Sequence, residues 1–170
     1  MTRKITAASL LLLMFVLNVQ AQSTIVGQAY AEVIAALTAS ENNQMNFGKF
    51  SPETSGGQIV LTPEGLRMAI GGVILGGGSA HAGKFKINGE PNASYTIQLP
   101  TTPALLTHNG SNKTMIVDNW VSDPPAGSGA IILNEGTETV SIGATLIVGP
   151  LDNNPVGVYT GTYSLTFAYN

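Results

Sequence analysis

The stretch GVYTGTYSLTFAYN (residues 157–170) alternates strictly between two kinds of side chain. Such alternation places one set on each face of a β-strand, because successive side chains of a strand point in opposite directions. One face carries small or polar residues, mainly threonines. The other face carries mostly aromatic residues, and its members are Tyr159, Gly161, Tyr163, Leu165, Phe167 and Tyr169. A regular, half-apolar strand therefore closes this sequence, although chain ends are usually frayed and polar.

Turn residues punctuate the rest of the chain. Clusters of Gly, Pro, Asn and Asp, such as SPETSGG at 51–57, recur roughly every 8–14 residues, a spacing typical of an all-β sandwich or barrel. The sequence therefore predicts one all-β domain, and we expect an antiparallel sandwich. A helix competes only in the alanine-containing stretch AYAEVIAALTA, where β-branched residues favour a strand instead. The predicted strands cover residues 28–39, 44–50, 58–62, 66–75, 83–88, 94–99, 113–121, 129–134, 139–148 and 157–169.

The first 21 residues have the features of a secretory signal. Arg3 and Lys4 precede an apolar run at residues 7–17, and small residues lead up to Ala21. The run is shorter than the roughly 20 residues that a membrane-spanning helix needs. We therefore expect cleavage between Ala21 and Gln22, giving a signal peptide at 1–21 and a mature sandwich domain at 22–170. The mature chain is then exported, to the periplasm, cell surface or medium, and has no membrane span.

The composition argues against several classes of partner. Without Arg3 and Lys4 of the signal, five of the seven basic residues remain against ten acidic ones. Such a negative surface does not attract nucleic acid or anionic lipid. Only 10% of the residues are charged and cysteine is absent, so the exported domain is held together by packing alone. A weakly charged β surface also tolerates close contact with other protein surfaces.

The sequence offers no recognisable catalytic constellation. His81 and His108 each fall in a predicted loop, and with no cysteine they do not supply the three or four ligands of a zinc site. The Asp152–Asn154 cluster fits turn chemistry as well as it fits calcium binding. Trp120 ends a predicted strand, where a packing role competes with stacking on a sugar. We expect no enzymatic activity, no metal and no cofactor.

Several stretches together resemble a known family. They are MNFGKFSP (45–52), INGEPNASYTIQLP (87–100), MIVDNW (115–120), SIGATLIVG (141–149) and residues 157–170. In order and spacing they are similar to the exported bacterial family known as domain of unknown function 4402, over nearly the whole mature chain. That family has no established activity. The resemblance implies an immunoglobulin-like β-sandwich akin to the fimbrial subunits and adhesins of Gram-negative bacteria.

The closing stretch also resembles the final motif of chaperone–usher pilus subunits, which has alternating apolar residues, a penultimate Tyr and a Gly fourteen places from the end. In pilus subunits such a strand borders a groove that another chain fills by β-strand addition. The resemblance implies partners that are copies of this chain or related subunits, and also a periplasmic chaperone. The alternative is a terminal strand in a complete sandwich. The implied assembly edge consists of Gly157, Tyr159, Tyr163, Leu165, Phe167 and Tyr169.

A pilus subunit also needs a free N-terminal extension of about ten or more residues, at about 3.3 Å each. The stretch STIVGQAYAEV (23–33) is the candidate donor segment, and the residues on its apolar face are Ile25, Gly27, Ala29, Ala31 and Val33. If the first strand begins near Gln28 instead, only residues 22–27 are free. The sequence leaves both readings open.

Two functions follow from this sequence. The first is a non-catalytic structural or adhesion subunit, similar to a pilin, that assembles by β-strand addition. The second is a self-contained secreted binding module, with glycans as the candidate ligand and Trp120 as the candidate stacking residue. The first should form multimers and the second should be a stable monomer.

Overall fold

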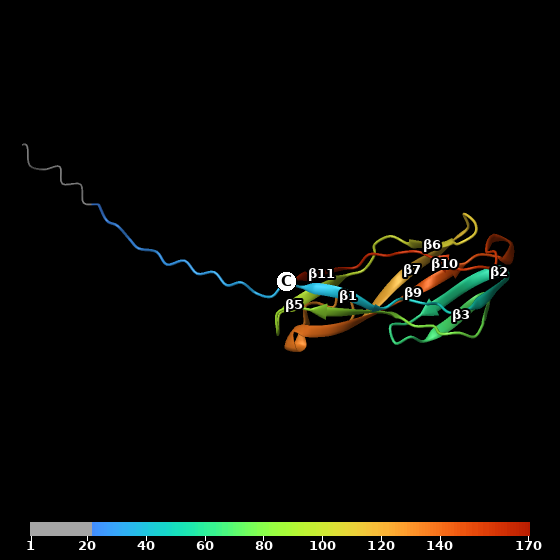
Figure 1. Ribbon diagram of the computed structural model, residues 1–170, viewed down its shortest axis with the longest axis horizontal. Helices are drawn as coiled ribbons and strands as arrows, with labels where there is room; N and C mark the ends of the chain where they lie inside the picture. The colour runs from blue at the N-terminus through green and yellow to red at the C-terminus, as the bar shows by residue number, and fades with distance from the viewer. Residues whose placement is uncertain (1–21) are drawn as a thin grey trace, which may run out of the picture. The chain divides into compact units, whose positions relative to one another are not determined.

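The computed structural model describes residues 22–170, so the predicted signal segment, with Ala21 at its cleavage site, lies outside the described residues. The chain divides into two units, Met1–Val33 and Ile34–Asn170. In the first unit, residues 22–33 are all exposed and belong to no helix or strand (Figure 1).

The second unit is an antiparallel, all-β sandwich, as the turn spacing predicts. One sheet has eight strands and the other has three, and two 3-10 turns interrupt the connections. The strands are β1 (Thr38–Asn43), β2 (Phe50–Leu61), β3 (Arg67–Leu75), β4 (Gly83–Asn88), β5 (Ser94–Gln98), β6 (Ala104–His108), β7 (Thr114–Asp123), β8 (Ile131–Ile132), β9 (Thr137–Val148), β10 (Tyr159–Thr160) and β11 (Thr166–Tyr169). The turns are η1 (Asn134–Gly136) and η2 (Leu151–Asn153).

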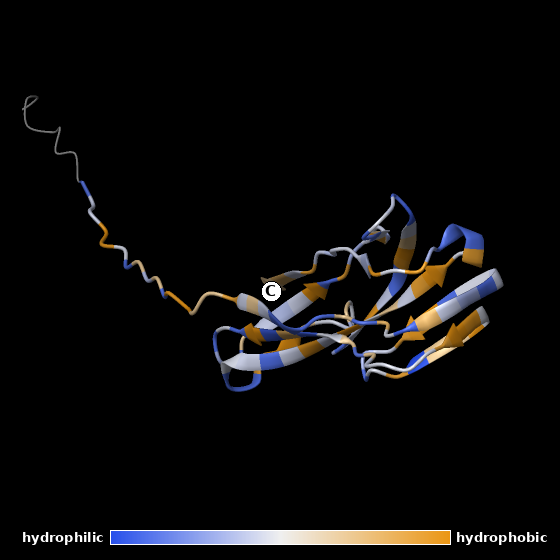
Figure 2. Ribbon diagram, turned by 45° about the vertical axis from the view of Figure 1, so that its right-hand side comes forward, coloured by the Kyte–Doolittle hydropathy of each residue, from blue (hydrophilic) through white to orange (hydrophobic). Residues whose placement is uncertain are grey.

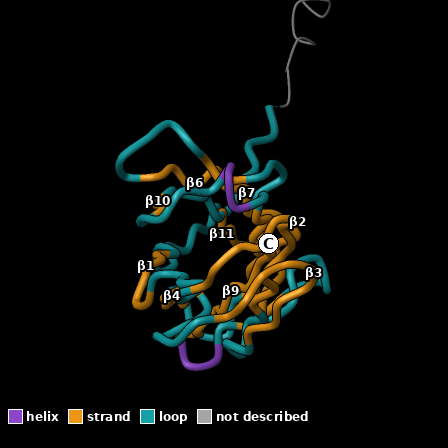
Figure 3. The backbone as a smooth tube through the Cα atoms, turned by 90° about the vertical axis from the view of Figure 1, so that its right-hand side faces the viewer, coloured by secondary structure: helices purple, strands orange, loops and turns teal. Residues whose placement is uncertain are grey.

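β9 organises the large sheet. Its first half pairs with β4 and its second half with β2, while β7 pairs with both halves and so lies along the opposite edge. β9 is buried almost without interruption from Val140 to Val148, in keeping with its pairing along both edges. Figure 3 shows β1 and β4 side by side, with β6 and β10 above them, at the other end of the strand order.

Two apolar clusters form the core, and hydrophobic and hydrophilic residues alternate along many of the strands around them (Figure 2). The first cluster lies under β2, β3, β7 and the second half of β9, and contains Phe47, Ile59, Leu61, Val73, Met115, Val117, Ala144, Leu146 and Val148. The second lies between β4, β5 and the first half of β9, and contains Ile87, Tyr95, Ile97, Leu133, Val140 and Ile142.

The start of the sandwich differs from the prediction. Residues 28–37 of the predicted 28–39 strand belong to no strand, and the predicted 44–50 strand is reduced to a single bridge between Asn46 and His81 before β2 begins. The first of these stretches is rich in alanine, which offers little apolar area to bury against a sheet and has low β-propensity. The N-terminal segment ahead of the sandwich is therefore longer than a first strand near Gln28 would leave.

Two further differences from the prediction concern one turn and one strand. The predicted turn at 51–57 lies inside β2, where the pairing with β3 resumes after a bulge between Pro52 and Gly57. Gly56 has a φ of +66° there and lies close to the backbone at Val148, a conformation and an approach that suit glycine at a bulge. β6, which follows the proline-containing stretch 99–103, was not among the predicted strands.

Candidate functional site

The closing stretch has the predicted alternation but not the predicted continuous strand. Residues 159–160 form β10 and pair with β6 in the large sheet, whereas residues 166–169 form β11 and pair with β5 in the small one. Residues 161–165 between them belong to no strand. The prediction of one strand over 157–169 is therefore wrong, because the backbone crosses from one sheet to the other.

The two faces of this stretch nevertheless differ in burial. The aromatic face points inward but is only partly buried, and its members are Tyr159, Tyr163, Leu165, Phe167 and Tyr169. The alternate residues from Thr160 to Ala168 are exposed. Leu165, Phe167 and Tyr169 pack against the second core cluster and Tyr159 against the first. The stretch therefore covers both clusters without fully closing over them.

The two glycines of this stretch lie where a side chain would collide. A Cβ at Gly161 would meet the backbone carbonyl of Leu105, and a Cβ at Gly157 would meet Nε2 of His108. His108 also contacts the Val156 carbonyl through Nε2, at 3.1 Å, and stacks edge-on against Tyr159. Gly157 is therefore explained by the close approach of the His108 ring.

An apolar groove opens beside this stretch. It begins as a cleft of about 510 Å³ between residues 46–52 and residues 154–159, lined also by Leu106, Met115 and Leu146 of the first core cluster and its margin. A smaller hollow of about 40 Å³ follows, with Met45 and Phe47 on one side and residues 161–163 on the other. We call these two adjacent hollows the core groove. Among residues 22–170, Lys49 is the only charged residue that lines it.

Hydrogen bonds to His81 and Arg67 hold residues 45–52, the N-terminal wall of the core groove, in place. Asn46 exchanges two backbone hydrogen bonds of 2.9 Å with His81. The Arg67 guanidinium donates to the carbonyls of Phe47 at 2.8 Å, Lys49 at 3.2 Å and Gly76 at 2.8 Å. A planar guanidinium with several donors can hold three carbonyls at once. Sequence reasoning missed this role of Arg67, since no local pattern links it to Phe47.

Two buried polar groups adjoin the narrow end of the core groove. The indole Nε1 of Trp120 and the hydroxyl of Tyr163 are buried and have no hydrogen-bond partner among the described residues. Their rings lie 4.7 Å apart between centroids. Burial raises the pKa of Tyr163, and the negative charge of Glu41 raises it further. The Trp120 side chain packs against both core clusters.

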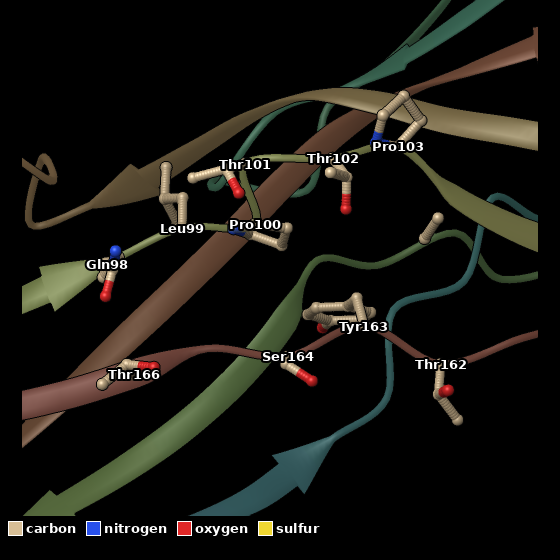
Figure 4. A pocket seen from close by; sticks show the side chains of 11 residues that line it. Gln98, Leu99, Pro100, Thr101, Thr102, Pro103, Thr162, Tyr163, Ser164 and Thr166 are labelled. Atoms are coloured by element: carbon tan, nitrogen blue, oxygen red, sulfur yellow. The ribbon is translucent and has the colours of Figure 1, made fainter.

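A third cleft, of about 390 Å³, lies on another side of the closing stretch. Figure 4 shows the loop 99–103 on one side of this cleft and residues 162–166 on the other. Its lining is rich in hydroxyl groups, from Thr101, Thr102, Thr162, Ser164 and Thr166, and contains no histidine, carboxylate or amine. The cleft therefore has hydrogen-bonding groups but no acid–base pair.

The candidate donor segment is exposed and belongs to no helix or strand. Ile25 is 92% and Val33 97% exposed, and Gly27, Ala29 and Ala31 between them are exposed as well. Residues 22–37 all precede β1. A first strand near Gln28, one of the two readings left open by the sequence, is not formed, because β1 begins only at Thr38.

The described residues contain few features of other site types. Within residues 22–170, no three His, Cys, Asp or Glu side chains gather as metal ligands would. In the same range, no helix has the length and apolar character needed to cross a membrane.

Comparison with known proteins assigns a family to this chain. The model of the family described as "Domain of unknown function (DUF4402)" matches residues 37–169, and the chain belongs to that family. No curated protein and no solved structure matches the chain. The family resemblance read from the sequence is thereby confirmed, and the match begins just before β1 and ends at the last residue of β11.

Proposed function

We propose that this member of the domain of unknown function 4402 family is an exported, non-catalytic subunit that assembles by β-strand addition. In this proposal the core groove is the acceptor and residues 23–33 of another copy, or of a related subunit, are the donor. A periplasmic chaperone would cover the same groove before assembly. The subunit acts in the periplasm, at the cell surface or outside the cell.

The observation that carries the proposal is the core groove itself. Its floor belongs to the first core cluster, and its two walls are the segment around Phe47 and the closing stretch of the chain. Residues 161–165 of that closing stretch pair with no strand. Unpaired backbone beside an apolar groove is what an added strand requires, because main-chain hydrogen bonds hold it while alternate side chains fill the groove.

The candidate donor segment matches the groove in chemistry and length. Its alternate residues from Ile25 to Val33 are apolar or small, and residues 23–31 carry no charge. The groove is lined by apolar residues along most of its length. An extended segment of residues 23–33 spans roughly 35 Å at about 3.3 Å per residue, which exceeds the at most about 26 Å that the wall at residues 45–52 would reach if fully extended.

The test starts with the purified mature chain. We expect multimers that resist detergent unless heated, seen on gels of unboiled samples and by size-exclusion chromatography. The double variant Ile25→Asp/Val33→Asp should lose them, because charges cannot enter an apolar groove without a large desolvation cost. The matched control Val26→Asp/Tyr30→Asp adds the same charge to the other face of the segment and should still assemble.

A second variant pair addresses the acceptor side. Thr162→Lys/Thr166→Lys changes only exposed positions of the closing stretch, so the sandwich should fold. Charges beside an open strand edge discourage pairing, so this variant should lose assembly while keeping the wild-type circular dichroism spectrum. If wild type and all variants are monomers of equal stability, strand addition is wrong and the self-contained binding module takes its place.

A further inference from the structure

A second apolar surface lies on the outward side of the large sheet, where β3, β2, β9, β7 and β6 follow one another. Directly paired residues of antiparallel strands point to the same side of a sheet. Leu105 pairs with Ile116, Ile116 with Ile147, Ile147 with Gln58, and Gln58 with Ile70. Four large aliphatic side chains and one glutamine therefore form a row across five strands.

A parallel row lies next to the first. It runs from Asp118 through Thr145 and Val60 to Met68. Beyond this second row, Val121 of β7 pairs with Gly143 of β9 on the same side. We call the surface formed by these rows the outer face. Asp118 is the only charged residue in its rows.

The outer face is exposed on β3, β6 and β7, whereas Thr145 on the central strand β9 is only 6% exposed. Ile70 is 55%, Met68 56% and Leu105 54% exposed, and Ile116 and Val121 are exposed as well. The alternate residues of the same strands, including Ile59, Val117 and Leu146, are buried in the first core cluster. An antiparallel sheet with one face on the core normally turns polar side chains to water on the other. The outward side of this sheet instead combines large apolar side chains with the polar Gln58, Asp118 and Thr145.

The size of the outer face can be estimated from strand geometry. Five strands about 4.8 Å apart and rows about 7 Å apart give a face on the order of 400 Å², of which the apolar part is near the low end of the largest apolar patches on monomers, which are often functional. Two such patches in contact would remove roughly 800–1,000 Å² from water in total. That area is at the low end for specific interfaces and fits a weak, reversible association.

We propose that the outer face packs against the outer face of a second copy of this chain, sheet on sheet. Rows without lysine or arginine offer nothing to nucleic acid or anionic lipid, whereas a self-complementary apolar face suits a two-fold interface. Pairing through the open edge of β3 would leave Leu105 and Ile116 in water, since they lie on the far side of the row. Face-to-face packing, as in sandwich cores, covers them all.

This contact is independent of strand addition. The core groove is lined by the inward side of the same sheet, so filling the groove leaves the outer face uncovered. A chain of subunits joined through their grooves would therefore still carry an apolar stripe able to hold a second chain alongside it.

The test uses the full mature chain carrying Ile25→Asp/Val33→Asp, in which strand addition by the donor segment is blocked. Analytical ultracentrifugation at increasing protein concentration should show a monomer–dimer equilibrium. Adding Ile70→Lys/Ile116→Lys should weaken this association at least about tenfold, because two charges would be buried without partners. The matched control is Ile132→Lys in β8 of the other sheet, a residue with a similar exposure of 53%. This control should leave the equilibrium unchanged.

Circular dichroism checks that the variants fold. If the lysine variant does not fold, Ile70→Thr/Ile116→Thr replaces it, because threonine is polar but suits a strand. A monomer at every concentration would overturn the proposal. Equal weakening by Ile132→Lys would overturn it too, since the effect would then not depend on this face.

Discussion

The hydroxyl of Tyr169 donates a hydrogen bond to the carbonyl of Ala35, with 2.9 Å between the two oxygens. The same hydroxyl accepts the N–H of Glu90 at 2.6 Å, and the Glu90 carboxylate accepts the N–H of Ala35 at 2.9 Å. Tyr169 and Glu90 thus hold both backbone groups of Ala35. This clamp ties β11 to the point where the sandwich unit begins, and gives a physical reason for a tyrosine at this position.

Replacing Tyr169 by Phe should loosen this clamp. The ring still packs on the second core cluster, but two hydrogen bonds are lost, which should lower the free energy of unfolding by about 1–2 kcal/mol. Amide exchange should speed up at residues 35–37. Tyr159→Phe is the matched control, because it removes one hydrogen bond, to Pro155, at the other end of the stretch. Equal exchange rates at residues 35–37 in both variants would contradict the clamp.

Arg67 should control the N-terminal wall of the core groove. Arg67→Lys keeps the charge but cannot hold three carbonyls in one plane. We expect a loss of about 1–2 kcal/mol for Lys and more for Ala, measured by urea denaturation, because carbonyls near Phe47 lose their donors. Amide exchange around residues 46–50 should rise in both variants. A fully protected segment in Arg67→Ala would show that the wall stands without the guanidinium.

The two glycines of the closing stretch should differ in their tolerance of alanine. At Gly161 the obstacle is the backbone carbonyl of Leu105, which cannot move without disturbing β6, whereas at Gly157 it is the end of the His108 side chain. Gly161→Ala should therefore cost about 2–3 kcal/mol of stability and Gly157→Ala less. Thermal unfolding measures both. If the His108 ring cannot rotate away, Gly157→Ala will lower the stability more than Gly161→Ala does.

Stability should fall at alkaline pH because of buried tyrosines. Burial raises the pKa of Tyr95 from 10.0 to about 12, and the charge of Glu138 adds to the shift. The folded state thus keeps a proton that the unfolded chain releases. The stabilisation is fully present below about pH 10 and is lost as the pH rises toward 12, with a slope of at most about 1.4 kcal/mol per pH unit from this group.

Tyr95→Phe checks this dependence. The hydroxyl of Tyr95 is buried and has no partner in the described part of the chain, so its removal should not lower stability at neutral pH. Urea denaturation between about pH 9 and 12 should show a shallower decline for the variant. Parallel curves for variant and wild type would show that another group causes the alkaline loss.

Some features of this protein follow from its sequence alone. Regularly spaced turn residues predict the all-β class, because the backbone angles of turns depend on the local residue type. The alternation from Tyr159 to Tyr169 predicts which side chains point inward, since the two-residue period of an extended chain is also local. Both predictions hold in the structure, the second even across residues 161–165, where no strand forms.

Other features depend on partners that are distant in the sequence. The crossing between β10 and β11, the bulge inside β2 and the position of β6 follow from which strands pair with one another, and no local pattern encodes those choices. The core groove exists because Phe47 and Tyr159, more than a hundred residues apart, line the same cleft together with Leu106. The outer face becomes visible only when the pairing register places Leu105, Ile116, Ile147 and Ile70 in one row. Local conformation is set by neighbouring residues, whereas these surfaces arise from long-range packing, which only the folded chain determines.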